Sequence, residues 1–234
     1  MAKRRTIELP EPEVETDDES NAQFYPQFEE LAKRLGHLAK LEQQYIDLQS
    51  AFSVSFVSAF MAEQPLYALG PDRYGVSRSG WTYHTALAIL QTCKMMDLVC
   101  KFETLGKRDA VIETHADPPK VILVAEWEWE FEDIFGSGKE LDKLQASCQK
   151  HSEMEAFLLT YCPTTLYPEF VQRVAEYWIE STGKQVNPPN LFLHTVLFDN
   201  KGGIRQFSRL RTAQLRVGQI LFWNDQLFGE ERTD

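Results

Sequence analysis

Three glutamates alternate with two tryptophans in the segment Glu126–Glu130, directly after the apolar run Val121–Ala125. Side chains alternate across a strand, so the glutamates share one face with Ile122 and Val124, and the tryptophans share the other face with Leu123. A run that is apolar on both faces is typical of a central strand covered on both sides. We therefore expect the carboxylates to gather where a buried strand reaches the surface. The alternative is an amphipathic edge strand with a solvated acidic face.

A second segment, Lys107–Thr114, also has the pattern of a strand, and Asp117 with the two prolines after it indicates a turn between the two segments. The two strands are expected to form a hairpin. A reversal between Asp117 and Pro118 would place Asp109 opposite Glu126, on the same face of the hairpin. A register slip of one residue would instead move Asp109 to the other face.

Two opposed carboxylates need a counter-charge. Side chains directly opposite each other in an antiparallel pair have Cβ atoms about 5 Å apart, and like charges there are destabilising. A divalent cation or an extra proton would relieve the repulsion. Mg²⁺ prefers oxygen ligands and commonly takes one or two carboxylates, with waters and a substrate phosphate completing its coordination. Asp109 and Glu126 are therefore predicted ligands of Mg²⁺ or Mn²⁺.

This arrangement resembles the PD-(D/E)XK (restriction-endonuclease-like) nuclease superfamily, in which an Asp on one strand and an acid-x-Lys on the next hold the catalytic metal. Asp109, Glu126 and Glu128 stand at the matching positions, although Glu128 replaces the usual lysine. Some type II restriction enzymes of that fold are similar in using a Glu-x-Glu form. The resemblance implies an α/β fold, with a mixed central sheet flanked by helices, and leaves open whether catalysis is retained.

The residues after the glutamates extend the resemblance. The turn sequence Gly136–Gly138 precedes a helical pattern over Lys139–His151. Uncharacterised bacterial members of the superfamily have a similar helix with a Glu-x-x-Lys-Leu signature, which begins here with Glu140 and Lys143. The resemblance covers about residues 82–200 and rests on short motifs.

The resemblance also implies roles for individual residues in the hydrolysis of DNA. Asp109 and Glu126 would hold the metal, which would stabilise charge on the phosphate and lower the pKa of a bound water. Glu128 would orient or deprotonate that water, and Lys107 or Lys143 would supply the positive charge of the missing lysine. The alternatives are a cross-strand ion pair between Lys107 and Glu128, and an ordinary exposed helix position for Lys143.

The chain carries a formal net charge of −11, which opposes binding to nucleic acid because contacts with phosphates supply most non-specific affinity. One short window has the opposite charge. It contains five basic residues and no acid: Lys201, Arg205, Arg209, Arg211 and Arg216. We expect this segment to contact the DNA backbone. The alternative is the solvated face of a strand.

The sequence pattern divides the chain into three parts. Residues 1–22 combine acidic residues and prolines with few apolar ones, and are expected to form a disordered acidic tail. Residues 23–63 have apolar residues at spacings of three and four, which predicts a long helix that packs against the core or pairs with a second copy of the chain as a homodimer. Residues 64–234 are the predicted nuclease-like domain, and Thr82–Val99 is its first predicted helix.

No apolar run approaches the roughly 20 residues of a membrane-spanning helix, and the first residues do not form an apolar signal core. We therefore expect a cytoplasmic protein without a membrane partner.

Two functions other than that of an active nuclease stay open. One is a nuclease fold without catalysis that acts as a binding or adaptor subunit of a larger nucleic-acid-related or defence assembly. The other is an interaction protein built around the long helix. A protein partner could also supply specificity to an active nuclease.

Overall fold

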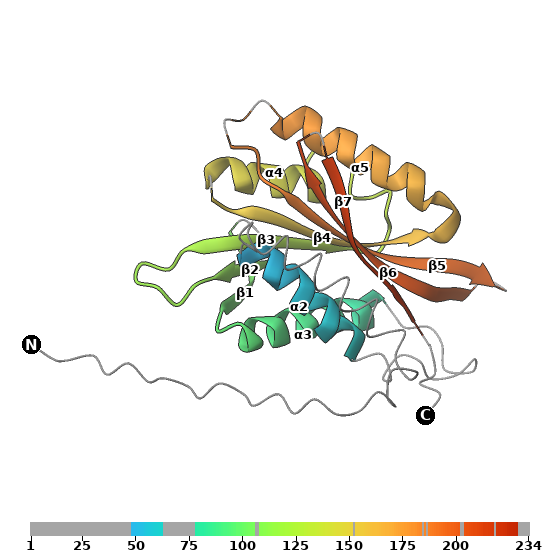
Figure 1. Cartoon of the computed structure of the whole chain (residues 1–234), viewed down its shortest axis with the longest axis horizontal. Coiled ribbons are helices and arrows are strands. Elements are labelled where there is room, and N and C mark those ends of the chain that lie inside the picture. The colour runs from blue at the N-terminus through green and yellow to red at the C-terminus, as the bar shows by residue number, and fades with distance from the viewer. Residues whose placement is uncertain are drawn as a thin grey trace, which may run out of the picture. The chain divides into compact units, whose positions relative to one another are not determined.

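The structure, a computed structural model, describes residues 48–62, 78–105, 108–151, 153–183, 185, 187–201, 204–217 and 219–228. This part of the chain is built on a mixed sheet of seven strands in the order β1-β2-β3-β4-β5-β6-β7 (Figure 1). Strands β1 to β3 are antiparallel neighbours, β3, β4 and β5 run parallel, and β5 to β7 are again antiparallel. The expected α/β fold with a mixed sheet and flanking helices is confirmed.

The order of the elements explains these strand directions. The helices are α2 (Leu48–Ala62), α3 (Arg78–Met95), α4 (Glu140–Lys150), the short 3₁₀ helix η2 (Thr164–Leu166) and α5 (Tyr167–Thr182), and the strands are β1 (Val99–Thr104), β2 (Arg108–Glu113), β3 (Val121–Glu128), β4 (Glu155–Pro163), β5 (Leu191–Lys201), β6 (Ile204–Arg216) and β7 (Gln219–Leu227). Parallel neighbours need a crossover connection, which α4 supplies between β3 and β4 and α5 supplies between β4 and β5.

Helices α2 and α3 cover one face of the sheet (Figure 1). Phe52, Phe56 and Phe60 recur on α2 at a spacing of four residues, and all three are fully buried. Phe56 makes an edge contact with Phe157 of β4, with 4.8 Å between the ring centroids, and Phe157 stacks on His194 of β5. The aromatic stripe of α2 therefore packs against the sheet of its own chain.

Helices α4 and α5 cover the opposite face (Figure 1). Leu141 and Leu144 of α4 belong to a second buried cluster that also contains Trp178 of α5. Strand β3 contributes to both clusters in turn, with Leu123 in the first and Val124 in the second. This confirms the prediction that Val121–Ala125 forms a strand covered on both sides.

The hairpin has the predicted register near its open end. Strands β2 and β3 pair Ala110 with Ala125 and Val111 with Val124, as the predicted reversal requires. The register shifts once, nearer the turn. Next to the turn, Glu113 pairs with Val121, so the reversal centres on Asp117 and not between Asp117 and Pro118. The extra residue in β3 at the shift brings the pairs nearer the open end to the predicted ones.

Two predicted helices differ from the observed ones. The helix expected over Thr82–Val99 is α3, Arg78–Met95, and Val99 instead begins β1. Strand β1 lies at the edge of the sheet and exposes several side chains, so its sequence lacks the apolar alternation of a buried strand. Of the helix expected over residues 23–63, the part that the structure describes is α2. Residues 1–47, with the expected acidic tail, lie outside the described residues.

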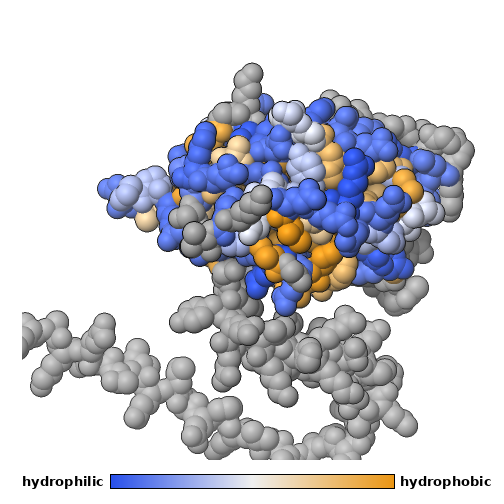
Figure 2. Space-filling model, turned by 90° about the horizontal axis from the view of Figure 1, so that it is seen from above, coloured by the Kyte–Doolittle hydropathy of each residue, from blue (hydrophilic) through white to orange (hydrophobic). Residues whose placement is uncertain are grey.

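Hydrophilic residues predominate on the face shown in Figure 2, and hydrophobic residues gather near its centre. Large apolar side chains that are exposed include Val54 of α2 and Phe222 of β7. Within the described ranges, no helix is both long enough and apolar enough to cross a membrane.

Candidate functional site

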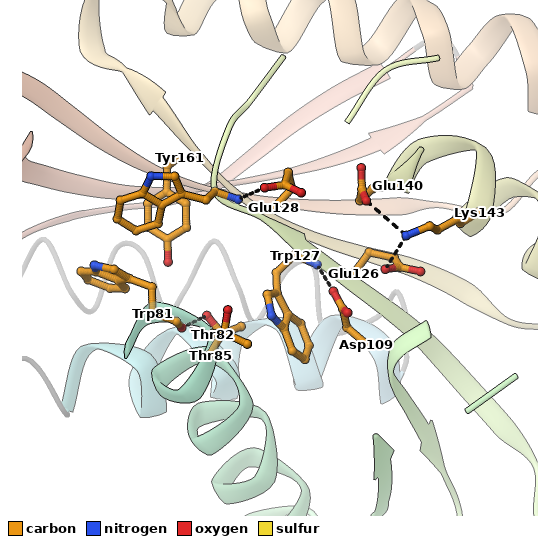
Figure 3. A pocket seen from close by; sticks show the side chains of 11 residues that line it. Trp81, Thr82, Thr85, Asp109, Glu126, Trp127, Glu128, Glu140, Lys143 and Tyr161 are labelled. Carbon is orange, nitrogen blue, oxygen red and sulfur yellow. Dashed lines mark hydrogen bonds and ion pairs between the residues drawn. The ribbon is translucent and has the colours of Figure 1, made fainter. Parts of the chain in front are cut away.

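A pocket of about 220 Å³ opens where β3 ends, and it contains the predicted acidic residues (Figure 3). Its charged lining residues are Asp109, Glu126, Glu128, Glu140 and Lys143, and its aromatic ones are Trp81, Trp127, Trp129 and Tyr161. In Figure 3, Glu126, Glu140 and Lys143 lie together on one side, Trp81 and Tyr161 lie on the other, and Trp127 lies between them. Helices from both faces of the sheet thus contribute to one pocket.

Asp109 ties the two strands of the hairpin together at this pocket. Its Oδ2 accepts a hydrogen bond from the backbone N–H of Trp127 at 2.8 Å, just beyond the last backbone pair, Ala110 with Ala125. Burial raises the pKa of Asp109 above its ordinary value, although the N–H of Trp127 and the charge of Lys143 oppose the rise. The predicted meeting of Asp109 with the end of β3 is confirmed.

Glu126 is the most deeply buried acid of the pocket, with 1% of its surface exposed. Its Oε2 lies 3.6 Å from Nζ of Lys143, and its Oε1 lies 3.6 Å from Nη1 of Arg108. Within the described residues, Oε1 has no hydrogen-bond partner. Burial, reinforced by the charge of Asp109, raises the pKa of Glu126 to about 8. A proton on Glu126 or a bound cation would relieve the repulsion between the two acids.

Helix α4 brings a cation and a third acid to the pair. Lys143 also forms an ion pair with Glu140, at 3.2 Å from Oε1, and its side chain is 31% exposed. Burial lowers the pKa of Lys143, but the carboxylates of Glu126 and Glu140 outweigh burial and raise it overall. The structure thus places Lys143 against Glu126, where the sequence left open an ordinary exposed position.

The turn before α4 sets the position of these two side chains. Gly136 and Gly138 adopt φ values of 104° and 73°, which residues with a Cβ rarely adopt. The N–H of Gly138 donates to Oδ2 of Asp142 in the first turn of α4, and Oδ1 of Asp142 accepts from the hydroxyl of Tyr177 on α5. Helix α4 is therefore anchored at the end that carries Glu140.

Arg108 and Glu140 were not predicted as site residues. Arg108 precedes Asp109 on β2, and its Nε donates to Oγ of Ser147 on α4 at 2.7 Å while its guanidinium faces Glu126. Glu140 is 8% exposed, and its Oε2 has no hydrogen-bond partner within the described ranges. The Glu-x-x-Lys spacing was the one signal in the sequence that pointed to Glu140.

The other two glutamates of the motif differ from Glu126. Strand β3 ends at Glu128, whose Oε1 accepts hydrogen bonds from the backbone N–H groups of Trp129 and Glu130. Glu130 lies beyond the strand and forms an ion pair with Arg205 of β6, whose Nη2 donates to both carboxylate oxygens, at 2.6 and 2.8 Å. The expected row of three acids on one face therefore ends before Glu130.

The predicted DNA-binding residues are spread over the two faces of the sheet. Arg205 lies over the rings of Trp129 and Phe198, which pack on the side of α2 and α3. Arg211 lies over Tyr167 of α5, on the other side.

Ion pairs also engage these basic side chains. Arg209 and Arg211 both pair with Asp225 of β7 at 3.0 Å, and the guanidinium Nε of Arg216 is buried. The side chain of Lys201 and the whole of Lys107 lie outside the described residues. Contact of this segment with DNA stays a prediction.

The oxygen atoms around Asp109 and Glu126 are of the kind that a hard divalent cation prefers. Among the described residues, no three His, Cys, Asp or Glu side chains are grouped closely enough to hold a metal ion. Mg²⁺ needs fewer protein ligands, because one or two carboxylates suffice when water and a phosphate complete its shell. Half-buried Asp109 beside buried Glu126, and the carboxylate oxygens of Glu126 and Glu140 without a hydrogen-bond partner in the described part of the chain, fit such a cation.

No protein-family model matches the chain, and comparisons with curated proteins and with solved structures found no match either.

Proposed function

We propose that this protein is a Mg²⁺- or Mn²⁺-dependent nuclease that hydrolyses phosphodiester bonds of DNA. The observation that carries the proposal is the meeting of half-buried Asp109 with buried Glu126, beside Lys143, where the β2–β3 hairpin opens into a pocket. Burial raises the pKa of both carboxyl groups, and groups with such shifts cluster at functional sites.

Each residue has a role that its position supports. Asp109 and Glu126 would hold the divalent cation. The bound cation would neutralise charge on the phosphate and lower the pKa of a water molecule. Lys143 supplies a positive charge beside Glu126, in place of the lysine that Glu128 replaces. Glu128, held by two backbone N–H groups, would orient the attacking water.

The order of the elements supports the resemblance to the PD-(D/E)XK superfamily. Helix α3 is followed by the antiparallel strands β1 to β3, by α4 and by the parallel strand β4. The acids of β2 and β3 lie at one end of the hairpin, and the Glu-x-x-Lys motif of α4 faces them. This is the same relation between acids, strands and lysine that the sequence motifs predicted.

The test is cleavage of plasmid, linear duplex and single-stranded DNA by the full chain, with Mn²⁺, with Mg²⁺ and with a chelator. Glu126→Gln and Asp109→Asn should each lower the metal-dependent rate by about a hundredfold or more, the size of effect seen when one preorganised charged group is removed. Glu130→Gln is the matched control, because Glu130 belongs to the same motif but pairs with Arg205 outside the pocket. Equal rates for all variants would contradict the proposal.

A second function is favoured by one specific observation. Glu126 already has two cationic neighbours, Lys143 and Arg108, and no group of three metal-binding side chains occurs within the described part. In a nuclease fold that has lost catalysis and serves as a binding subunit, the protein's own cations would neutralise the buried acid in this way. This function predicts that neither DNA cleavage nor thermal stability responds to Mg²⁺ or Mn²⁺.

A further inference from the structure

The pocket at the end of β3 has a second half that the proposed chemistry does not use. Beside the acids, four aromatic side chains line it: Trp81 from α3, Trp127 and Trp129 from the end of β3, and Tyr161 from β4. Figure 3 shows Trp81 and Tyr161 on the side away from Lys143, with Trp127 between the two halves. Trp81 and Tyr161 are each 3% exposed and belong to the core cluster, whereas Trp127 and Trp129 are half-buried at its edge.

Three of these rings form one cluster with tilted and edge contacts. The ring centroids of Trp129 and Tyr161 lie 4.7 Å apart, those of Trp81 and Tyr161 lie 5.4 Å apart, and those of Trp81 and Trp129 lie 6.2 Å apart. Arg205 supports Trp129, since its guanidinium lies 4.9 Å from the centre of that ring and one nitrogen donates to the Trp129 carbonyl. This aromatic wall is therefore preorganised by packing and by an ion-paired arginine.

Trp127 differs from these three residues. It is half-buried, and within the described residues its ring stacks on no other aromatic ring. Its backbone N–H is bonded to the Asp109 carboxylate, so the residue that carries this ring also touches the acid pair. A flat group that stacks on Trp127 would have its attached phosphate within reach of Asp109 and Glu126.

We propose that the aromatic half of the pocket binds an unpaired nucleobase next to the scissile phosphate, so that the substrate is single-stranded DNA or the single-stranded end of a duplex. The inference rests on the proposed nuclease function. Every base has a flat π-face, and stacking of bases on aromatic side chains is the usual way in which proteins bind single strands. A paired base inside a duplex cannot enter such a pocket unless it is flipped out.

The size and charge of the pocket agree with this substrate. Its volume of about 220 Å³ lies below the roughly 300–1,000 Å³ of pockets that enclose drug-sized ligands. It therefore suits one base rather than a longer piece of chain. A local contact with one base also suits a chain of net charge −11, which has little general attraction for a duplex.

The experiment measures binding of a short oligonucleotide that contains one 2-aminopurine, whose fluorescence is quenched by stacking. The full chain is titrated against this oligonucleotide as a single strand and as a blunt duplex, in chelator, so that no cleavage occurs. We expect the single strand to bind at least about tenfold more tightly. Trp127→Leu should weaken its binding about ten- to hundredfold and abolish quenching, because stacking of one base is lost. Trp127→Phe should retain most of both.

Trp223→Leu is the matched control, because Trp223 is also a half-buried tryptophan that packs against the same core cluster but lies on β7, outside this pocket. It should bind like the unaltered chain. Thermal unfolding shows whether each variant is folded, and Trp127→Phe tests the proposal even if Trp127→Leu unfolds.

The outcomes separate this inference from the proposed function. Metal-dependent cleavage without a preference for single strands, and with binding unaffected by Trp127→Leu, would overturn the inference and leave the nuclease intact. Single-strand binding that needs Trp127, without metal-dependent cleavage, would support the base site and contradict the nuclease. Equal loss of binding in Trp127→Leu and Trp223→Leu would overturn the base site.

Discussion

At the scale of single residues, the alternation of β3 predicts which face Glu126 occupies. The turn alone does not fix the partner of Glu126, because Glu113 pairs with Val121 and the register shift beyond this pair sets Asp109 toward Glu126. Lys143 could be found through its spacing from Glu140. The aromatic wall could not be predicted, since Trp81 and Tyr161 come from α3 and β4, and no local pattern relates their positions to β3.

The raised pKa of Glu126 predicts a pH-dependent stability. Because the folded-state pKa, about 8, exceeds the ordinary value of 4.5, the stability that this group contributes is complete below pH 4.5 and is lost as the pH rises to 8. The Glu126→Gln variant has no ionisable group at this position. In chelator, its free energy of unfolding should therefore equal that of the unaltered chain at about pH 4 and exceed it by a few kcal/mol at about pH 9.

Urea unfolding of both proteins across this pH range measures the difference. A difference that stays constant with pH would show that Glu126 does not titrate in this window. Glu130→Gln serves as the control, since the Glu130 side chain is 44% exposed and its substitution should leave the pH dependence unchanged.

At the scale of elements, the strands with continuous apolar runs were predictable and the edge strand was not. Strand β3 is buried on both faces and has the sequence of a core strand. Strand β1 exposes three of its six residues and follows α3 after a short turn, so its sequence continues the pattern of a helix. Four of the five residues of the basic window lie on β6, Ile204–Arg216. The ion pairs of this strand with Glu130 and Asp225 depend on neighbours that the sequence does not identify.

Helix α2 is an integral part of the hydrophobic core of the sheet, and this makes a prediction about Phe56. The side chain is fully buried between Phe60, Phe157 and His194. Phe56→Ala should lower the free energy of unfolding by about 3–5 kcal/mol, because it removes a large buried ring and leaves a cavity. Chemical denaturation measures the change.

The control for this substitution is Phe222→Ala, because Phe222 is 62% exposed on β7. It should change stability by less than about 0.5 kcal/mol, as expected of an exposed position. A small effect of Phe56→Ala would mean that α2 contributes little to the domain and is free for other contacts.

At the scale of the whole molecule, charge and site suggest the same kind of substrate. A net charge of −11 gives little non-specific attraction to a duplex, and Arg205, Arg209 and Arg211 are already paired with acids. Under the proposed function, recognition would be concentrated in one pocket, where stacking and a cation would act together. The acidic motif on which the proposed chemistry depends is local in the sequence, whereas the proposed base site depends on side chains that meet only in the fold.

The proposed function requires that Asp109 and Glu126 hold a divalent cation, and calorimetric titration of the full chain with Mn²⁺ measures this binding. We expect binding at a single site, with release of a proton near neutral pH because the pKa of Glu126 is about 8. Asp109→Asn and Glu126→Gln should abolish this binding, and Glu130→Gln should retain it. Binding that survives both pocket substitutions, or no binding to any of the proteins, would contradict the proposed function.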